Sequence, residues 1–179
     1  LLTRAVRPPA DRCHHHSIDY TNLAFAAGAS GDTVIPVPSL VAEGSSHIAY
    51  FAGARYGNTK RWPGFSELAR KMYESTGLPS VFYGSSEEEP ALREASADIP
   101  LIVIRTDLTL PKLASHLLSS VLAVGNDSGG VHVSAVLGIP TVTLFGSTSP
   151  VWTAPIGSFT ETIKSDRACS PCFKSKCPY

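Results

Sequence analysis

Long hydrophobic runs are absent from this sequence of 179 residues. No apolar segment approaches the roughly 20 residues needed to cross a bilayer, so the sequence predicts no membrane-spanning helix. Excess charge of either sign is also absent, because 15 Lys and Arg residues balance 15 Asp and Glu residues. Overall charge therefore gives no argument for a nucleic acid partner or an anionic membrane surface. Any partner must be selected by local sites.

Cysteine is scarce, and low-complexity composition is missing. The 14 glycines and 14 prolines fall well below the roughly 25–30% that marks low-complexity chains. Of four cysteines, Cys13 stands alone, while Cys169, Cys172 and Cys177 lie close together near the carboxyl terminus. This is not the dispersed framework of a disulfide-stapled secreted protein, so a reducing, cytoplasmic setting is predicted. The length suits one compact domain.

The amino-terminal part lacks both an initiating Met and the pattern of a secretory signal. We therefore expect the chain to be a piece of a longer protein, with a domain missing upstream. Residues 1–45 are expected to form a connector with one helix, Ser17–Gly28, which Ser17 caps and Gly28 ends. The segment Pro36–Pro38 can only be extended. Residues 46–166 are expected to form the main domain and residues 167–179 a cysteine-rich tail.

From His47 onward, short apolar runs alternate with amphipathic stretches. The apolar spacing of i, i+3, i+4, i+7 and i+8 predicts helices with one apolar stripe each. Short strands that are apolar on both faces imply a parallel sheet covered on both sides. We therefore predict an α/β, doubly wound, Rossmann-like domain, with ligands beyond the carboxyl ends of the strands. The expected strands are 47–52, 80–83, 101–105, 121–124 and 141–145, and the expected helices are 63–75, 110–119 and 131–137.

A glycine-rich turn, Gly125–His132, follows strand 121–124 and opens the next helix. Glycines let a backbone approach a ligand closely, and the free N–H groups of a helix start favour phosphate. The alternative is that Asp127 or Ser128 only caps the helix. His132 lies one turn into the helix and can face the same ligand, although a lone histidine is usually structural.

A basic loop, residues 53–63, leaves the first strand and places Arg55, Lys60 and Arg61 at the same edge of the sheet. Lysine supplies a point charge to a diphosphate and arginine a two-pronged fork, so this loop favours an anionic ligand. The alternative is a solvated basic loop with Trp62 packed beside the helix.

A third loop, residues 84–89, follows strand 80–83 and holds three consecutive glutamates. Acidic residues are favoured at a solvated helix start by the helix dipole. A carboxylate beyond a strand end is also how nucleotide-binding sheets hold ribose hydroxyls. Both interpretations stay open for this loop.

Four stretches together resemble the ADP-heptose:lipopolysaccharide heptosyltransferases, glycosyltransferase family 9, in the carboxyl-terminal domain of their GT-B fold. The order and spacing of the stretches make the resemblance more specific than any single motif would. It covers roughly residues 46–177, and the tail is most similar to the branch that adds the second heptose. The stretches are YGNTKRWP at 56–63, GSSEEE at 84–89, NDSGGVH at 126–132 continuing through LGIP to LFGSTSP at 150, and CSPCFKSKC at 169–177.

The resemblance implies an inverting, metal-independent transfer of heptose from ADP-L-glycero-D-manno-heptose to a sugar hydroxyl of the lipopolysaccharide inner core. It implies donor-binding roles for eight residues and no cofactor or metal. The implied roles are diphosphate binding by Lys60, with Arg55 at the same edge; backbone N–H donation by Ser128 and Gly129; contact with the donor sugar or phosphate by Asp127 and His132; ribose binding by Glu88; and adenine recognition at Leu108.

The resemblance also implies that an amino-terminal domain, absent here, binds the lipopolysaccharide acceptor and supplies the general base, so the catalytic residues are not assigned. It implies a cytoplasmic protein of a Gram-negative bacterium with peripheral contact to the inner membrane, and no nucleic acid partner. Two alternatives stay open. One is a GT-B transferase that uses another nucleotide sugar, such as UDP-N-acetylglucosamine, and the other is a non-catalytic nucleotide-binding module.

Two metal-like patterns remain. Cys169, Cys172 and Cys177 supply three thiols with no fourth ligand in evidence, so a disulfide or free thiols are favoured over a zinc or iron–sulfur site. The tract His14–His16 is interpreted as an exposed polar helix edge, because one short tract gives no fixed geometry.

Overall fold

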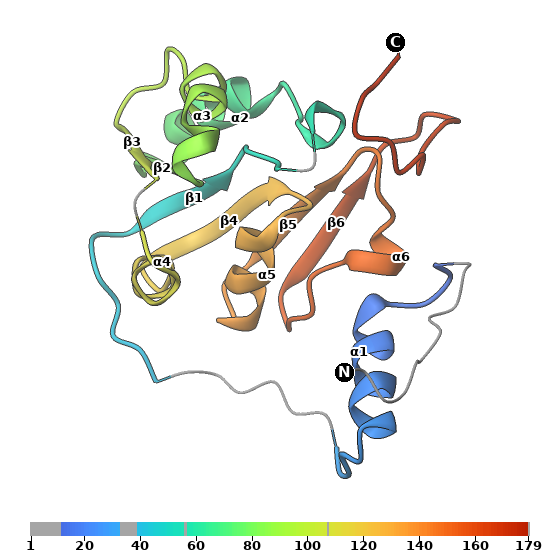
Figure 1. Ribbon diagram of the computed structural model, residues 1–179. Coiled ribbons are helices and arrows are strands. Elements are labelled where there is room, and N and C mark those ends of the chain that lie inside the picture. Colours follow the sequence, from blue (N-terminus) through green and yellow to red (C-terminus); the bar gives the residue numbers. More distant parts are fainter. Residues whose placement is uncertain (1–11, 33–38, 56, 107, 179) are drawn as a thin grey trace.

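The computed structural model describes residues 12–32, 39–55, 57–106 and 108–178. The segment 36–38, which we predicted as extended, lies outside the described residues, and so does Tyr56. The six strands form one parallel sheet in the order β3-β2-β1-β4-β5-β6 (Figure 1). The order reverses between β1 and β4, as in doubly wound nucleotide-binding folds, which confirms the predicted fold class. The strands are β1 His47–Phe51, β2 Ser80–Tyr83, β3 Ile102–Arg105, β4 Ser120–Asn126, β5 Thr141–Phe145 and β6 Thr160–Lys164.

The central strand β1 is buried on both faces because its side chains alternate between two cores. Ile48 and Tyr50 pack in one core with side chains of α2 (Phe65–Thr76) and α3 (Glu89–Ala95). Ala49 and Phe51 pack in the other core with side chains of α4 (Leu110–Leu117) and α5 (Gly129–Val136). Figure 1 shows the two pairs of helices on opposite sides of the sheet.

We predicted that helices cover both faces of the sheet, but one face is covered only in part. On the side of α2, apolar residues of β4, β5 and β6 line an open groove of about 590 Å³ rather than the underside of a helix. The edge strand β6 leaves most of its side chains exposed. The apolar groove-lining sheet residues are Leu122, Val124, Val142, Leu144, Phe145 and Ile163.

Helix α1, His16–Ala26, corrects one predicted cap. Ser17 lies inside the helix, and its backbone N–H donates to His15 Nδ1 over 3.2 Å. His15 can cap because its Nε2 also contacts the carbonyl oxygen of Ala154 at 2.8 Å, which fixes the ring. Gly28, with φ of 99°, follows the helix end as predicted.

The histidine tract does not form a joint site. His14 contacts Asp19 at 2.9 Å, and His16 stacks on Trp152 with 4.7 Å between ring centroids. Among the described residues, no group of three or more His, Cys, Asp or Glu side chains is arranged to hold a metal ion. The helices of the described segments are too short or too polar to cross a membrane.

Candidate functional site

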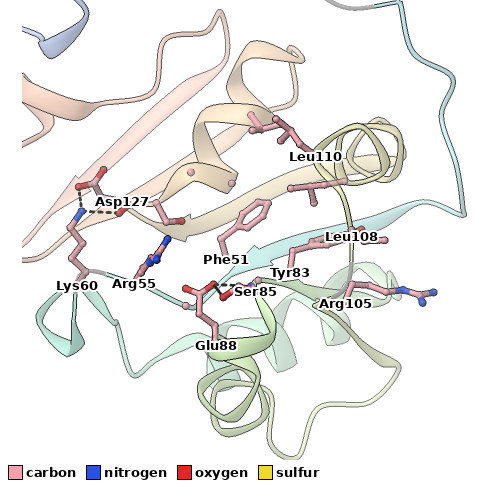
Figure 2. Close-up of a pocket in the computed structure, with 18 residues that line it drawn as sticks. Phe51, Arg55, Lys60, Tyr83, Ser85, Glu88, Arg105, Leu108, Leu110 and Asp127 are labelled. Carbon is pink, nitrogen blue, oxygen red and sulfur yellow. Dashed lines mark hydrogen bonds and ion pairs between the residues drawn. The ribbon is translucent and has the colours of Figure 1, made fainter. Parts of the chain in front are cut away.

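A cavity of about 500 Å³ opens beyond the carboxyl ends of β1, β2 and β4 (Figure 2). It lies at the edge of the sheet where ligands bind in this class of fold. Most of the predicted donor-binding residues line it: Arg55, Lys60, Glu88, Leu108, Asp127, Ser128 and Gly129. The structure therefore brings together residues from all three predicted loops and from the segment after β3.

His132 is the predicted site residue that does not line this cavity. Its Nε2 lies 3.9 Å from Asp127 Oδ1, beyond hydrogen-bond distance but close enough for an ion pair when the ring is protonated. Arg61 of the basic loop also faces elsewhere, toward the groove beside α2 and toward the cysteine-rich tail.

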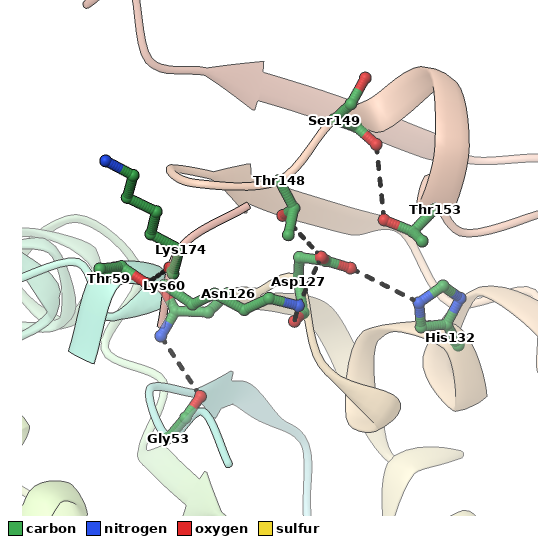
Figure 3. A network of polar contacts seen from close by, with 10 residues as sticks. All are labelled: Gly53, Thr59, Lys60, Asn126, Asp127, His132, Thr148, Ser149, Thr153 and Lys174. Atoms are coloured by element: carbon green, nitrogen blue, oxygen red, sulfur yellow. Dashed lines mark hydrogen bonds and ion pairs between the residues drawn. The ribbon is translucent and has the colours of Figure 1, made fainter. Parts of the chain in front are cut away.

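Lys60 and Asp127 join the basic loop to the glycine-rich turn. Lys60 ends the short 3-10 helix η1, Asn58–Lys60, and Asp127 directly follows β4. The Lys60 Nζ donates to Asp127 Oδ2 at 2.7 Å and to the Asp127 carbonyl oxygen at 3.0 Å (Figure 3). The side chains are 16% and 5% exposed, so this is a largely buried ion pair at the cavity edge.

Asp127 stays ionised despite its burial. Burial alone raises the pKa of this carboxyl, but contacts with His132, Lys60 and Thr148 together outweigh it and lower the pKa from 3.8 to about 2. The Thr148 hydroxyl donates to Oδ2 at 2.7 Å. The sequence analysis did not single out Thr148, which lies 21 residues further along the chain. A carboxylate held in this way fixes the Lys60 ammonium at the cavity wall.

The low pKa of Asp127 predicts acid sensitivity. Because the folded-state pKa is depressed, its stabilising contribution is present above about pH 4 and is lost as the pH falls toward 2. We expect the wild type to lose about 2 kcal/mol more of its unfolding free energy across this range than Asp127→Asn. Urea unfolding of both proteins at several pH values measures the difference. Parallel pH profiles would contradict the assignment.

The side chains of the glycine-rich turn do not cap the backbone N–H groups at the start of α5. Ser128 occupies the N-cap position of α5, yet its side chain makes no capping hydrogen bond. The Asp127 carboxylate is held by Lys60 and Thr148 instead. The simple-cap interpretation is therefore not what the structure shows, and the first backbone N–H groups of α5 remain available to an anion. A Cβ at Gly129 would meet no atom within 4 Å, so open space lies over this residue.

Asn126 ties the turn to the neighbouring loops, a role that the sequence analysis missed. Its side chain is fully buried. The Nδ2 group donates to the Ala52 carbonyl oxygen at 2.8 Å, and Oδ1 accepts from the Trp62 backbone N–H at 3.1 Å. Asn126 thus holds the ends of β1 and β4 and the chain after η1 in fixed relation. The signal available was a polar residue continuing an apolar strand.

Asn126→Ala is expected to destabilise the fold by about 2 kcal/mol, because it removes the hydrogen bonds to the buried Ala52 carbonyl oxygen and to the partly buried Trp62 N–H. Chemical denaturation measures the change. The matched control, Asn22→Ala on the exposed side of α1, is expected to change stability by less than about 0.5 kcal/mol. Equal effects of the two substitutions would contradict the bracing role of Asn126.

Glu88 caps a helix start and also lines the cavity. Its Oε2 accepts from the Ser85 backbone N–H at 2.9 Å and from the Ser85 hydroxyl at 3.1 Å, which closes a capping box at the start of η2, Ser86–Glu88. The same side chain lines the cavity and packs against Gly53, where a Cβ would collide with Oε1. Capping therefore fixes the carboxylate at the cavity wall.

The opposite part of the cavity is apolar. In Figure 2, Lys60, Arg55 and Asp127 lie at one side of the cavity and Leu108 and Leu110 at the other, with Phe51 between them. Arg105, which the sequence analysis did not identify, also lines the wall. A ligand with a charged end and a flat apolar end fits this division. The other apolar lining residues include Leu113 and Val133.

The chain matches the family model described as Glycosyltransferase family 9 (heptosyltransferase) over residues 17–179. Lipopolysaccharide heptosyltransferase 1 of Pseudomonas aeruginosa is 27% identical, over 92% of this chain and 49% of the relative. Lipopolysaccharide heptosyltransferase 2 of Escherichia coli is 30% identical, over 65% of this chain and 36% of the relative. The chain thus spans about half the length, or less, of the curated relatives it matches.

Solved structures share the fold. A family 9 glycosyl transferase from Veillonella parvula superposes with a TM-score of 0.72 at 20% identity, over 92% of this chain and 55% of that one. The E. coli heptosyltransferase WaaC, solved with ADP, gives a TM-score of 0.66 at 19% identity, over 85% of this chain and 51% of that one.

Proposed function

This chain belongs to glycosyltransferase family 9, and from that premise we propose that it forms the donor-binding half of a heptosyltransferase. The proposed reaction moves heptose from ADP-L-glycero-D-manno-heptose to the lipopolysaccharide inner core, with inversion and without a metal. Among relatives of both types, we assign the chain to the branch that adds the second heptose, because of the motif CSPCFKSKC.

One observation carries the proposal: a single cavity combines three cationic side chains, those of Arg55, Lys60 and Arg105, with an open helix start, the Glu88 carboxylate and a largely apolar end. We assign Lys60, Arg55 and the N–H groups of Ser128 and Gly129 to the diphosphate. Glu88 is assigned to the ribose and the Leu108 segment to the adenine. Asp127 and the neighbouring His132 are assigned to the donor sugar or phosphate.

The proposed chemistry follows from where charge develops. Transfer of the sugar leaves negative charge on the ADP leaving group, and fixed cations and helix-start N–H groups stabilise that charge. Lys60 is already oriented by Asp127, so little reorganisation is needed when the charge appears. We assign none of the described residues as general base. Acceptor binding and base catalysis are proposed for the rest of the protein, which would work at the cytoplasmic face of the inner membrane.

The organisation proposed for the chain follows the sequence expectation. Residues 1–45 are assigned as an interdomain connector, residues 46–166 as the nucleotide-sugar domain and residues 167–179 as a tail. Limited proteolysis tests these boundaries, since cleavage is expected before residue 46 rather than within the sheet.

Calorimetric titration with ADP, ADP-heptose, UDP and UDP-N-acetylglucosamine tests the function. We expect ADP and ADP-heptose to bind and the uridine compounds to bind at least tenfold more weakly. Tighter binding of UDP would favour a transferase for another nucleotide sugar. Binding of ADP without any gain from the heptose would favour a nucleotide-binding module.

A further inference from the structure

A second cavity, of about 430 Å³, lies on the other side of η1. Its walls come from η1, the residues after β5 and the tail segment, residues 165–178. Figure 1 shows this tail beside the ends of β5 and β6. Three cationic side chains line the cavity, Arg61, Arg167 and Lys174, together with hydroxyl groups and three thiols. No Asp or Glu is among the described residues that line it.

The three cations form no ion pair with a carboxylate of the described residues. Within the described segments, no ion pair involves Arg61, Arg167 or Lys174. By contrast, four other surface cations are paired with glutamates at 3.1 Å or less, namely Arg70, Lys71, Arg93 and Lys112. In a chain with equal numbers of acidic and basic residues, three unpaired cations around one cavity create a locally positive potential.

A buried hydroxyl group adds an independent signal. Ser147 lines the cavity, is only 4% exposed, and its hydroxyl has no hydrogen-bond partner among the described residues. Buried polar side chains are normally satisfied by protein groups or by bound solvent or ligand. The Ser147 hydroxyl can therefore donate a hydrogen bond to a bound acceptor, and the three cations that line the same cavity are donors as well.

Hydrogen bonds and close packing fix the tail against the walls of this cavity. The Ser170 hydroxyl donates to the Gly146 carbonyl oxygen at 2.7 Å, and the Phe173 N–H donates to the Ser147 carbonyl oxygen at 2.7 Å. On the other wall, the Thr59 hydroxyl donates to the Lys174 carbonyl oxygen at 2.5 Å. Gly57 packs so closely that a Cβ there would collide with the Ser175 carbonyl oxygen.

We propose that this second cavity binds an oxyanion, either a phosphate or a carboxylate group. An arginine guanidinium can donate two hydrogen bonds to either oxyanion, and the serine hydroxyl and lysine ammonium supply further donors, with no carboxylate among the described residues that line the cavity. The site uses different residues from the first cavity and does not depend on the function proposed for it.

The cysteines of the cavity report on its occupancy. Cys169, Cys172 and Cys177 line it as free thiols, whereas Cys13 does not line it. Alkylation by iodoacetamide, a neutral reagent, is followed for each cysteine by peptide mass spectrometry. Millimolar inorganic phosphate, glucose 6-phosphate and glucuronate are added in parallel, with sodium chloride at equal ionic strength. We expect phosphate or glucuronate, but not chloride, to slow alkylation of Cys172 and leave Cys13 unchanged.

Substitutions connect this protection to the cavity. Arg61→Gln and Arg167→Gln are each expected to raise the half-protecting concentration about tenfold, and Ser147→Ala several-fold. Two matched controls are expected to leave it unchanged: Arg55→Gln in the first cavity and Arg70→Gln on the surface of α2. The three added compounds identify the bound group. Protection by glucuronate alone indicates a sugar carboxylate, and protection by inorganic phosphate and glucose 6-phosphate indicates a phosphate. No protection, equal protection by chloride, or protection that depends on Arg55 overturns the proposal.

Discussion

Replacing Lys60 with methionine is expected to lower the free energy of unfolding by about 3 kcal/mol and to weaken ADP binding at least tenfold. Methionine keeps most of the side-chain volume, so the main loss is the ammonium group. Asp127 would then remain buried as a carboxylate with Thr148 and His132 but without its cation. Urea unfolding and calorimetric titration measure the two effects on the same protein.

A double-mutant cycle separates stability from binding. Lys60→Met combined with Asp127→Asn is expected to recover most of the lost stability, because no unpaired charge remains, yet not the ADP affinity. Lys71→Met is the matched control: Lys71 forms an exposed ion pair with Glu67 at 2.8 Å, and its loss is expected to change stability by less than about 0.5 kcal/mol. Additive stability losses in the cycle would contradict the buried-pair interpretation, and unchanged ADP affinity would contradict the proposed role of Lys60.

Adjacent glycines in the turn are expected to give opposite results. A Cβ at Gly130 would collide with the Phe51 ring, which is buried between β1 and α5. Gly130→Ala is therefore expected to destabilise the fold by about 3 kcal/mol, even though alanine favours a helix over glycine. Thermal or chemical denaturation measures this loss.

Gly129→Ala provides the matched comparison. A Cβ at Gly129 enters open space, so stability is expected to stay within about 0.5 kcal/mol or to rise slightly. The added methyl group would occupy the anion cradle, and ADP affinity is expected to fall at least tenfold. Equal stability losses for the two variants would contradict the packing described for Phe51. Unchanged ADP affinity of Gly129→Ala would contradict the assignment of this turn to the donor-binding site.

Much of the fold was predictable because its central elements follow simple periodicities. The five predicted strands, which correspond to β1 to β5, and the three predicted helices of the main domain, which correspond to α2, α4 and α5, all begin and end within two residues of the predicted ranges. Strand β6 was missed because its sequence, TETIK, is mostly polar and lies exposed at the sheet edge. Helix α3 was missed because its seven residues, which follow an acidic run, are too few to show a repeating apolar pattern.

The candidate site was predictable where a motif concentrated its residues. Lys60, Asp127 and Gly129 stand in loops whose composition already favours an anionic ligand. Asn126 and Thr148 were not assigned, because their importance depends on partners 64 and 21 residues away along the chain. Arg105 likewise becomes a wall residue only through the pairing of β2 with β3. Tertiary contacts of this kind leave no local periodicity in a single sequence.

The short helix η1 acts as a partition one turn thick. Lys60 faces the first cavity, while Asn58 and Thr59 face the second. Because the two cavities share no lining residue, coupling between their ligands would require this turn to move, and any such coupling must be reciprocal, each ligand changing the affinity for the other by the same factor.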